Sequence, residues 1–246
     1  MRWGILAGLA AVLGCTSGPD NKLTPGYEGA PSLQRFLVCA PNTVISLPPE
    51  LREGTVMVRD QIDAYLRFHE RESQSLDLVA CQKLWTEAMT AAKEKGVLEH
   101  TPAFFARKLD ETHDFDAIVM PSLIVHQART MNGYASWDGV ERRMGVFKGS
   151  AERRLKRDQQ AQQVANNGAS GNLLVTSVHV LVFSPAGVRI FEGRGGIDFV
   201  QELDLSKFLR KRAAEYRVRD QLPGSLDAVR EGVALAFSPL LPVPAE

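Results

Sequence analysis

The sequence predicts an α/β (α+β) fold, a mixed sheet of about four to five strands with helices packed on it, in a single domain. Continuous apolar runs bounded by turn residues, which are typical of buried strands, occupy 35–40 and 115–120. Apolar residues recur at helical spacing in 58–69, 81–92 and 226–237. Strand and helix segments thus alternate along the chain, which favours helices layered over a sheet.

The first half of the chain is predicted to begin with a strand and to continue with helices. Arg35 to Ala40 forms a short buried strand in this interpretation, and Pro41-Asn42 ends it. The spacing of apolar residues from Val58 to His69 and from Cys81 to Ala92 predicts two helices. Thr101-Pro102 predicts the start of a third, short helix, because Pro at the first helical position loses no hydrogen bond.

The second half adds a central strand, a hairpin and a closing helix. The nearly continuous apolar sequence from Phe115 to Met120, extended by Leu123 to Val125, is typical of a strand covered on both faces. The segments Leu173 to Phe183 and Val188 to Glu192 are separated by a turn with Pro and Gly, which predicts an antiparallel hairpin. Pro223-Gly224-Ser225 precedes the closing helix.

The N-terminal residues predict an export signal. Met1-Arg2 precedes nine apolar residues, Ile5 to Leu13, too few to span a bilayer but enough for a signal peptide. The sequence Val12-Leu13-Gly14-Cys15 resembles the lipobox of bacterial lipoproteins. That resemblance implies cleavage after Gly14 and acylation of Cys15 by palmitate-type chains, and Thr16 resembles the residue that follows Cys in outer-membrane lipoproteins. The alternative is an ordinary signal peptide cut near Ala10.

The chain therefore divides into four parts. Residues 1–14 are the lipoprotein signal peptide, and 15–32 are the acylated Cys with a flexible tether interrupted by Pro and Gly. Residues 33–238 form the periplasmic domain, with a polar insert at 129–172, and 239–246 form a Pro-rich tail.

Composition excludes several classes of protein. The 29 basic and 29 acidic residues cancel, which argues against nucleic-acid binding, and 44% hydrophobic residues exclude a disordered chain. After loss of the anchor, Cys39 and Cys81 are the remaining cysteines. Two alternatives stay open for them, a disulfide permitted by an oxidising compartment and two buried reduced thiols.

Signatures of catalysis are weak. The five His residues form no compact zinc motif, and the Gly-rich sequence Gly193-Arg194-Gly195-Gly196 lacks the last Gly of a dinucleotide loop; it is predicted to let a strand bulge or end. We therefore predict no catalytic residue, cofactor or metal. The alternative function is a lipid-anchored periplasmic hydrolase that uses His126 or His179 with Asp116.

A basic segment beside two aromatic residues predicts a partner-binding surface. Residues 141–158 hold seven basic side chains against three acidic ones. This excess favours docking of an acidic protein, lipid or glycan; the alternative is a solvated helical arm. A second basic run at 207–219 would strengthen docking if it shared that face. The candidate residues are Tyr134, Trp137, Arg142, Arg143, Arg153 and Arg154.

The element order also resembles a known superfamily. Phe115-Asp116-Ala117-Ile118-Val119-Met120-Pro121, Ser177-Val178-His179-Val180-Leu181-Val182-Phe183 and the final helix resemble periplasmic lipoproteins with an anticodon-binding-like fold. That family includes the curli secretion channel protein, lipoprotein activators of penicillin-binding proteins and the Tol translocation protein N-terminal domain. The resemblance implies a non-enzymatic, outer-membrane, periplasm-facing lipoprotein. It would bind an envelope protein or glycan, or further copies of itself, and the insert departs from the family pattern.

Overall fold

The structure is a computed structural model, and it describes residues 21–25, 27, 32–44, 51–131, 134–143, 173–204, 215–219, 225–238 and 240–241. For 202–204 and 215–217 the description covers the backbone alone. Within these ranges, no helix has both the length and the apolar character needed to cross a membrane.

The described elements follow the predicted order with several additions. The helices are α1 (Arg52–Phe68), α2 (Leu78–Glu94), the 3-10 turn η3 (Leu98–His100), α3 (Thr101–Asp110) and α6 (Leu226–Phe237). The long strands are β4 (Ala117–Gln127), β8 (Leu174–Phe183) and β9 (Arg189–Phe199). The short strands are β1 (Lys22–Leu23), β2 (Arg35–Val38), β3 (Glu72–Ser75), β5 (Arg129–Met131), β6 (Tyr134–Trp137), β7 (Val140–Arg143), β10 (Gln201–Asp204) and β11 (Glu215–Val218).

The main sheet is mixed and confirms the predicted fold class. It has six strands in the order β1-β9-β8-β4-β2-β3, more than the four to five expected. β2 runs parallel to β3 and β4, whereas β4, β8, β9 and β1 pair antiparallel. Two strands of this sheet, β1 and β3, are absent from the prediction. Both lie at a sheet edge, and the polar sequence of β3, Glu-Ser-Gln-Ser, carries no apolar signal.

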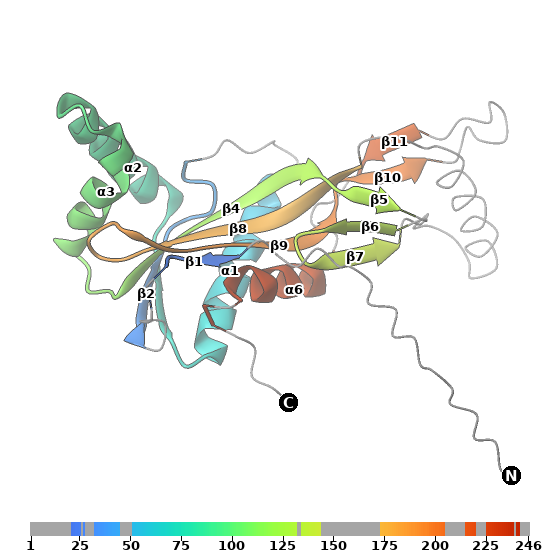
Figure 1. Cartoon of the computed structure of the whole chain (residues 1–246), viewed down its shortest axis with the longest axis horizontal. Helices are drawn as coiled ribbons and strands as arrows, with labels where there is room; N and C mark the ends of the chain where they lie inside the picture. The colour runs from blue at the N-terminus through green and yellow to red at the C-terminus, as the bar shows by residue number, and fades with distance from the viewer. Residues whose placement is uncertain are drawn as a thin grey trace, which may run out of the picture.

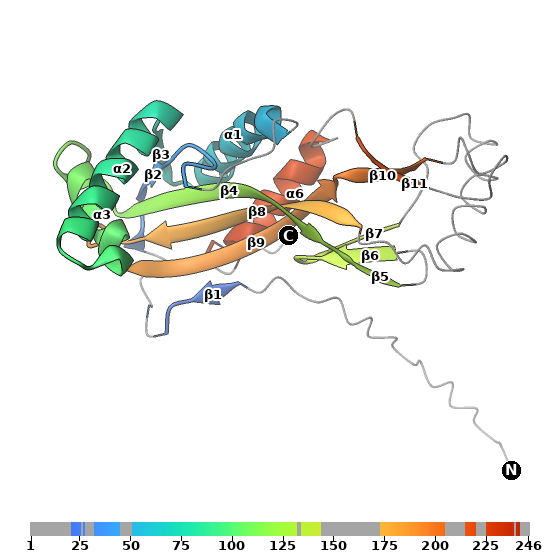
Figure 2. The same cartoon turned by 90° about the horizontal axis from the view of Figure 1, so that it is seen from above.

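The two faces of the sheet have separate cores. Alternate residues of β4 point to opposite faces, so Val119 joins the core under α1 and α6 while Ile118 and Met120 join the core under α2 and α3. Figures 1 and 2 show α2 and α3 at one end of the long strands, and β5, β6 and β7 at the other.

Glycines in β9 allow α6 to lie directly on the sheet. A Cβ at Gly195 would overlap the carbonyl oxygen of Gly232 in α6, and one at Gly193 would overlap the carbonyl oxygen of Ala236. The Gly-rich sequence does not end the strand, which runs on to Phe199, but the pairing with β8 has a register shift directly after Gly196, as expected of a bulge. Gly193 and Gly195 also allow the close approach of helix to strand.

The domain boundaries differ from the prediction at both ends. Part of the predicted tether is bound to the domain, since β1 pairs with β9 and Asn21 is anchored by its side chain. The Asn21 amide donates to the carbonyl oxygens of Leu235 (2.6 Å) and Ser238, and its Oδ1 accepts from Arg194 N–H at 2.7 Å. In the predicted tail, Leu240 and Leu241 are buried, so the core extends past residue 238.

The start of the insert is also ordered. β5, β6 and β7 form a three-stranded antiparallel sheet where a polar excursion was expected. The β6–β7 turn is Asp138-Gly139, and both residues have positive φ, 37° and 84°. These angles are those of the hairpin turn that favours Asp-Gly. Residues 144–172 lie outside the described part of the chain.

Candidate functional site

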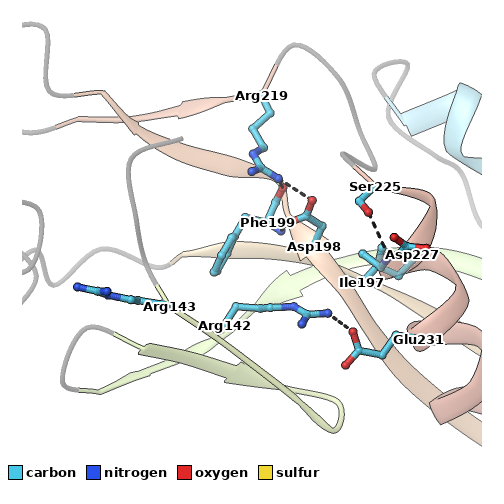
Figure 3. A pocket seen from close by; sticks show the side chains of 10 residues that line it. Arg142, Arg143, Ile197, Asp198, Phe199, Arg219, Ser225, Asp227 and Glu231 are labelled. Atoms are coloured by element: carbon cyan, nitrogen blue, oxygen red, sulfur yellow. Dashed lines mark hydrogen bonds and ion pairs between the residues drawn. The ribbon is translucent and has the colours of Figure 1, made fainter. Parts of the chain in front are cut away.

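Arginines from separate segments line a cavity at the end of the molecule that carries β5, β6 and β7, opposite α2 and α3. The cavity has a volume of about 530 Å³ and lies between β7, the end of β9, the residue after β11 and the first turn of α6 (Figure 3). Its charged lining consists of three arginines and three carboxylates: Arg142, Arg143, Arg219, Asp198, Asp227 and Glu231. The charges of these six side chains cancel, but the arginines can bind anions and the carboxylates can bind cations.

The charge pairs in this cavity differ in burial. Arg219 Nη1 lies 2.7 Å from Asp198 Oδ2, and both side chains are largely buried, at 13% and 17% exposure. Arg142 pairs with Glu231 of α6, and this pair is more exposed, at 34% and 47%. A buried pair is costly to break, whereas an exposed pair contributes only about 0–1 kcal/mol. The Arg142–Glu231 pair is therefore the one that a bound anion can exchange.

The β6–β7 register sorts the predicted binding residues onto two faces. Tyr134 lies opposite Arg143, and Trp137 lies opposite Val140. Tyr134 and Arg143 belong to the outward face, where Tyr134 is 42% exposed, and Figure 3 shows Arg143 extending in the opposite direction from Arg142. Arg142 belongs to the inward face and reaches α6. An exposed aromatic and a basic residue therefore stand side by side just before residue 144.

Trp137 is placed in a core and not on the surface. It is 3% exposed, packs against Phe199 with ring centroids 5.3 Å apart, and donates from Nε1 to the carbonyl oxygen of Thr176 at 3.1 Å. With Val140 and Val175 it attaches the small sheet to the main one. The ring offers no surface to a partner, so its prediction as a docking residue needs correction.

Other predicted residues fall partly outside the described ranges. Cys15, Arg153 and Arg154 lie outside them. Of the second basic run, Arg219 is described, and it lines the same cavity as Arg142 and Arg143. The side chains of the run from 207 to 217 are not described.

The residues of the alternative hydrolase are not brought together. Asp116 lies before β4 and pairs with Arg35 at 2.9 Å, and this hydrogen bond from Arg35 lowers the pKa of the Asp116 carboxyl to about 2. His126 lies ten residues further along the same extended chain, which is about 33 Å at the rise of a strand. His179 instead lies 3.0 Å from Glu192. Asp116 therefore pairs with Arg35 and is not the carboxylate partner of His126 or His179.

A different Ser, His and Asp do meet, but not in a catalytic arrangement. His126 Nε2 lies 2.9 Å from Ser177 Oγ and 2.9 Å from Asp138 Oδ2, the latter at ion-pair distance without hydrogen-bond alignment. A catalytic triad uses the two ring nitrogens separately, one for the serine and one for the carboxylate. Here both contacts use Nε2, and Ser177 is fully buried. The cluster joins the β6–β7 turn to the sheet.

The electrostatics of that cluster fit a structural role. Burial raises the pKa of Asp138, but His126 and Ser177 beside it outweigh burial, so the pKa lies below its usual value.

His179 lies outside that cluster. Burial is the largest influence on its pKa, which lies below the usual value although Glu192 beside it acts in the opposite direction. Among the described residues, no group of three or more His, Cys, Asp or Glu is arranged to hold a metal ion.

Comparison with protein-family models, with curated proteins and with solved structures finds no match for this chain. The charged site residues that the sequence did not single out are Asp198, Asp227 and Glu231. Asp198 and Glu231 each lie far along the chain from the arginine that they pair with, so no local pattern signals them. Arg142, Arg143 and Arg219 were found because local charge excess can be counted from the sequence.

Proposed function

We propose that the protein is a lipid-anchored lipoprotein of the outer membrane that faces the periplasm and binds an acidic segment of another envelope component, without catalysing a reaction. The observation that carries this proposal is that Arg142, Arg143 and Arg219 all line one open cavity, with Arg143 on the outward face of the small sheet opposite the exposed Tyr134. Arg and Tyr are the residue types enriched at protein-binding hot spots.

The Arg142–Glu231 pair supplies a mechanism for binding. A carboxylate or phosphate of the partner takes the place of Glu231 on Arg142, at low cost because the existing pair is exposed. Guanidinium binds such groups with two parallel hydrogen bonds, which adds geometric selectivity. Arg219 remains on Asp198 and keeps the cavity wall in place. Binding by this exchange weakens as ionic strength rises.

Site-specific photo-crosslinking in cells tests the binding surface. A photoreactive phenylalanine analogue at Tyr134 is expected to capture a partner, whereas the same analogue at Phe68, an exposed aromatic at the end of α1, is expected to capture none. Arg142→Glu with Arg143→Glu should reduce the yield at least tenfold, while Arg59→Glu, an exposed helical arginine, should not. Equal capture from 134 and 68, or capture insensitive to the double substitution, argues against this surface. A product of twice the chain mass would identify a second copy as the partner.

Fractionation tests the anchor. Wild-type protein is expected in the detergent-soluble membrane fraction, and Cys15→Ala in the soluble periplasmic fraction, because two or more acyl chains give stable anchoring. Membrane retention of the Cys15→Ala chain would contradict the lipoprotein assignment.

A further inference from the structure

Two buried thiols from different elements are in contact. Cys39 directly follows β2, and Cys81 lies in the first turn of α2; both are fully buried and both are reduced. The Ala40 N–H, adjacent to Cys39, donates to Cys81 Sγ at 3.4 Å, and each cysteine is the largest influence on the pKa of the other. The two cysteines therefore lie side by side at the junction of strand and helix.

The two sulfur atoms have different environments. The pKa of Cys81 is lowered mainly by the Cys39 thiol, with smaller contributions from the Ala40 N–H, which donates to its sulfur, and from the Thr43 hydroxyl, which donates to the Ala40 carbonyl oxygen. Its place in the first turn of a helix also favours a thiolate. The pKa of Cys39 is raised well above its usual value, because it donates to Cys81 and is buried. Cys81 is thus the better nucleophile.

A cavity lies next to this pair. It has a volume of about 230 Å³, and its walls include Ala40, Thr43, Trp85 and His179. The Ala40 N–H donates to Cys81 Sγ, and the Thr43 hydroxyl donates to the Ala40 carbonyl oxygen. Both cysteines are fully buried behind this wall, so a disulfide reagent reaches Cys81 Sγ from the cavity only when residues of the wall move aside.

We propose that Cys39 and Cys81 form a reversible disulfide that links β2 to α2, with Cys81 as the attacking sulfur and Cys39 as the resolving one. This proposal does not rest on the proposed function. The oxidant is a disulfide, either of a protein thiol oxidoreductase or of oxidised glutathione.

The exchange proceeds in two balanced steps. The Cys81 thiolate attacks one sulfur of oxidised glutathione, whose disulfide bond breaks; a mixed disulfide forms and one glutathione leaves as a thiolate. Cys39 then loses its proton and attacks Cys81 Sγ, which releases the second glutathione. The protein loses two electrons and two protons, and glutathione gains both as two thiols.

Thiol counting on the full chain carrying Cys15→Ser tests the pair, because this background retains only Cys39 and Cys81. The folded chain is reduced, exposed to oxidised glutathione, quenched with acid, and then unfolded and labelled with a maleimide. We expect loss of both reactive thiols, an intact mass lower by two hydrogens, and a peptide that joins residues 39 and 81. Reduced glutathione should restore both thiols. Two thiols that survive oxidation in the folded chain, and react only after unfolding, would overturn the proposal.

Single substitutions test the assigned order of attack. With Cys39→Ser, Cys81 should accumulate a glutathione adduct because no resolving thiol is present. With Cys81→Ser, Cys39 should stay unmodified in the folded chain. A stable adduct on Cys39 instead would overturn the assignment. Circular dichroism before oxidation verifies that each variant is folded. If a variant is unfolded, thiol counting on the Cys15→Ser chain, which keeps both cysteines, still tests the disulfide.

Discussion

Gly195 offers a direct test of how α6 is held on the sheet. In Gly195→Ala, the new Cβ would overlap the Gly232 carbonyl oxygen and lie 2.8 Å from the backbone nitrogen of Ala236. The closest of these contacts, with the Gly232 carbonyl oxygen, is 1.8 Å. Since comfortable separations are roughly 3.5 Å or more, the helix and the strand must separate by about 1.7 Å there. No side chain can rotate to relieve the overlap, because all the atoms involved belong to the backbone or are Cβ itself.

The expected loss of stability is about 3 kcal/mol. Overpacking of a core costs about 1–3 kcal/mol, and this case lies at the upper end because displacement of the helix also loosens its fully buried face. That face consists of Val229, Val233, Ala236 and Phe237. For a domain of about 200 residues, this loss corresponds to a Tm lower by roughly 6–12 °C.

Thermal unfolding followed by circular dichroism measures the effect, with Gly232→Ala as the matched variant. That Cβ would lie 2.9 Å from the Gly196 carbonyl oxygen and from Ile197 Cγ1, a milder conflict. Alanine also favours a helix over glycine by about 1 kcal/mol, which offsets part of the cost. Equal Tm values for Gly195→Ala and wild type, or a larger loss for Gly232→Ala, would refute the close-packing argument.

Three other substitutions probe the fold and the site. Asp116→Asn should lower stability at pH 7 by about 1 kcal/mol after allowance for solvent screening, because the hydrogen bond from Arg35 holds the carboxyl pKa at about 2. The folded pKa is depressed, so this contribution is complete above pH ~4 and is lost as pH falls toward 2; Tm curves of variant and wild type that do not converge there would exclude it. Trp137→Phe leaves the buried carbonyl of Thr176 without its donor and should cost about 1–2 kcal/mol in urea unfolding, while crosslinking from position 134 stays unchanged. Asn21→Ala removes the side-chain bonds to α6 and β9, so it should cost about 1 kcal/mol or more and speed protease cleavage near residue 21; unchanged digestion would show that these bonds are dispensable.

Sequence reasoning found the elements that are apolar or periodic and missed those that are neither. The strand around Ile118 is a continuous apolar run, and α6 repeats apolar residues at helical spacing, so both were predicted. Edge strands such as Glu72–Ser75 need no buried face and carry no such pattern. The role of Gly195 depends on a helix that lies about 37 residues further along the chain. The local sequence therefore indicates only that position 195 has no room for a side chain.

The same distinction applies to the candidate site. Counting charges identified Arg142 and Arg143, but Glu231 is 89 residues from Arg142, and only the fold brings them together. Trp137 looked like a docking residue because exposed and buried aromatics have the same sequence signature. The alternation of buried and outward residues in β6 and β7 separates Trp137 from Tyr134, and that alternation is short and mostly polar, so it was not recognised as strand.

The anchoring of Asn21 bears on how the domain would stand on a membrane if Cys15 is acylated as proposed. Under the proposed acylation of Cys15, only six residues separate the lipid from the Asn21 side chain, which limits the span to about 20 Å. Asn21 grips the C-terminal end of α6, at Leu235 and Ser238, while the arginine-lined cavity lies at the opposite end of that helix. A short linker that is fixed at the C-terminal end of α6 would leave the N-terminal end of this helix pointing away from the bilayer. The cavity would then be presented toward the cell wall side of the periplasm and not toward its own membrane.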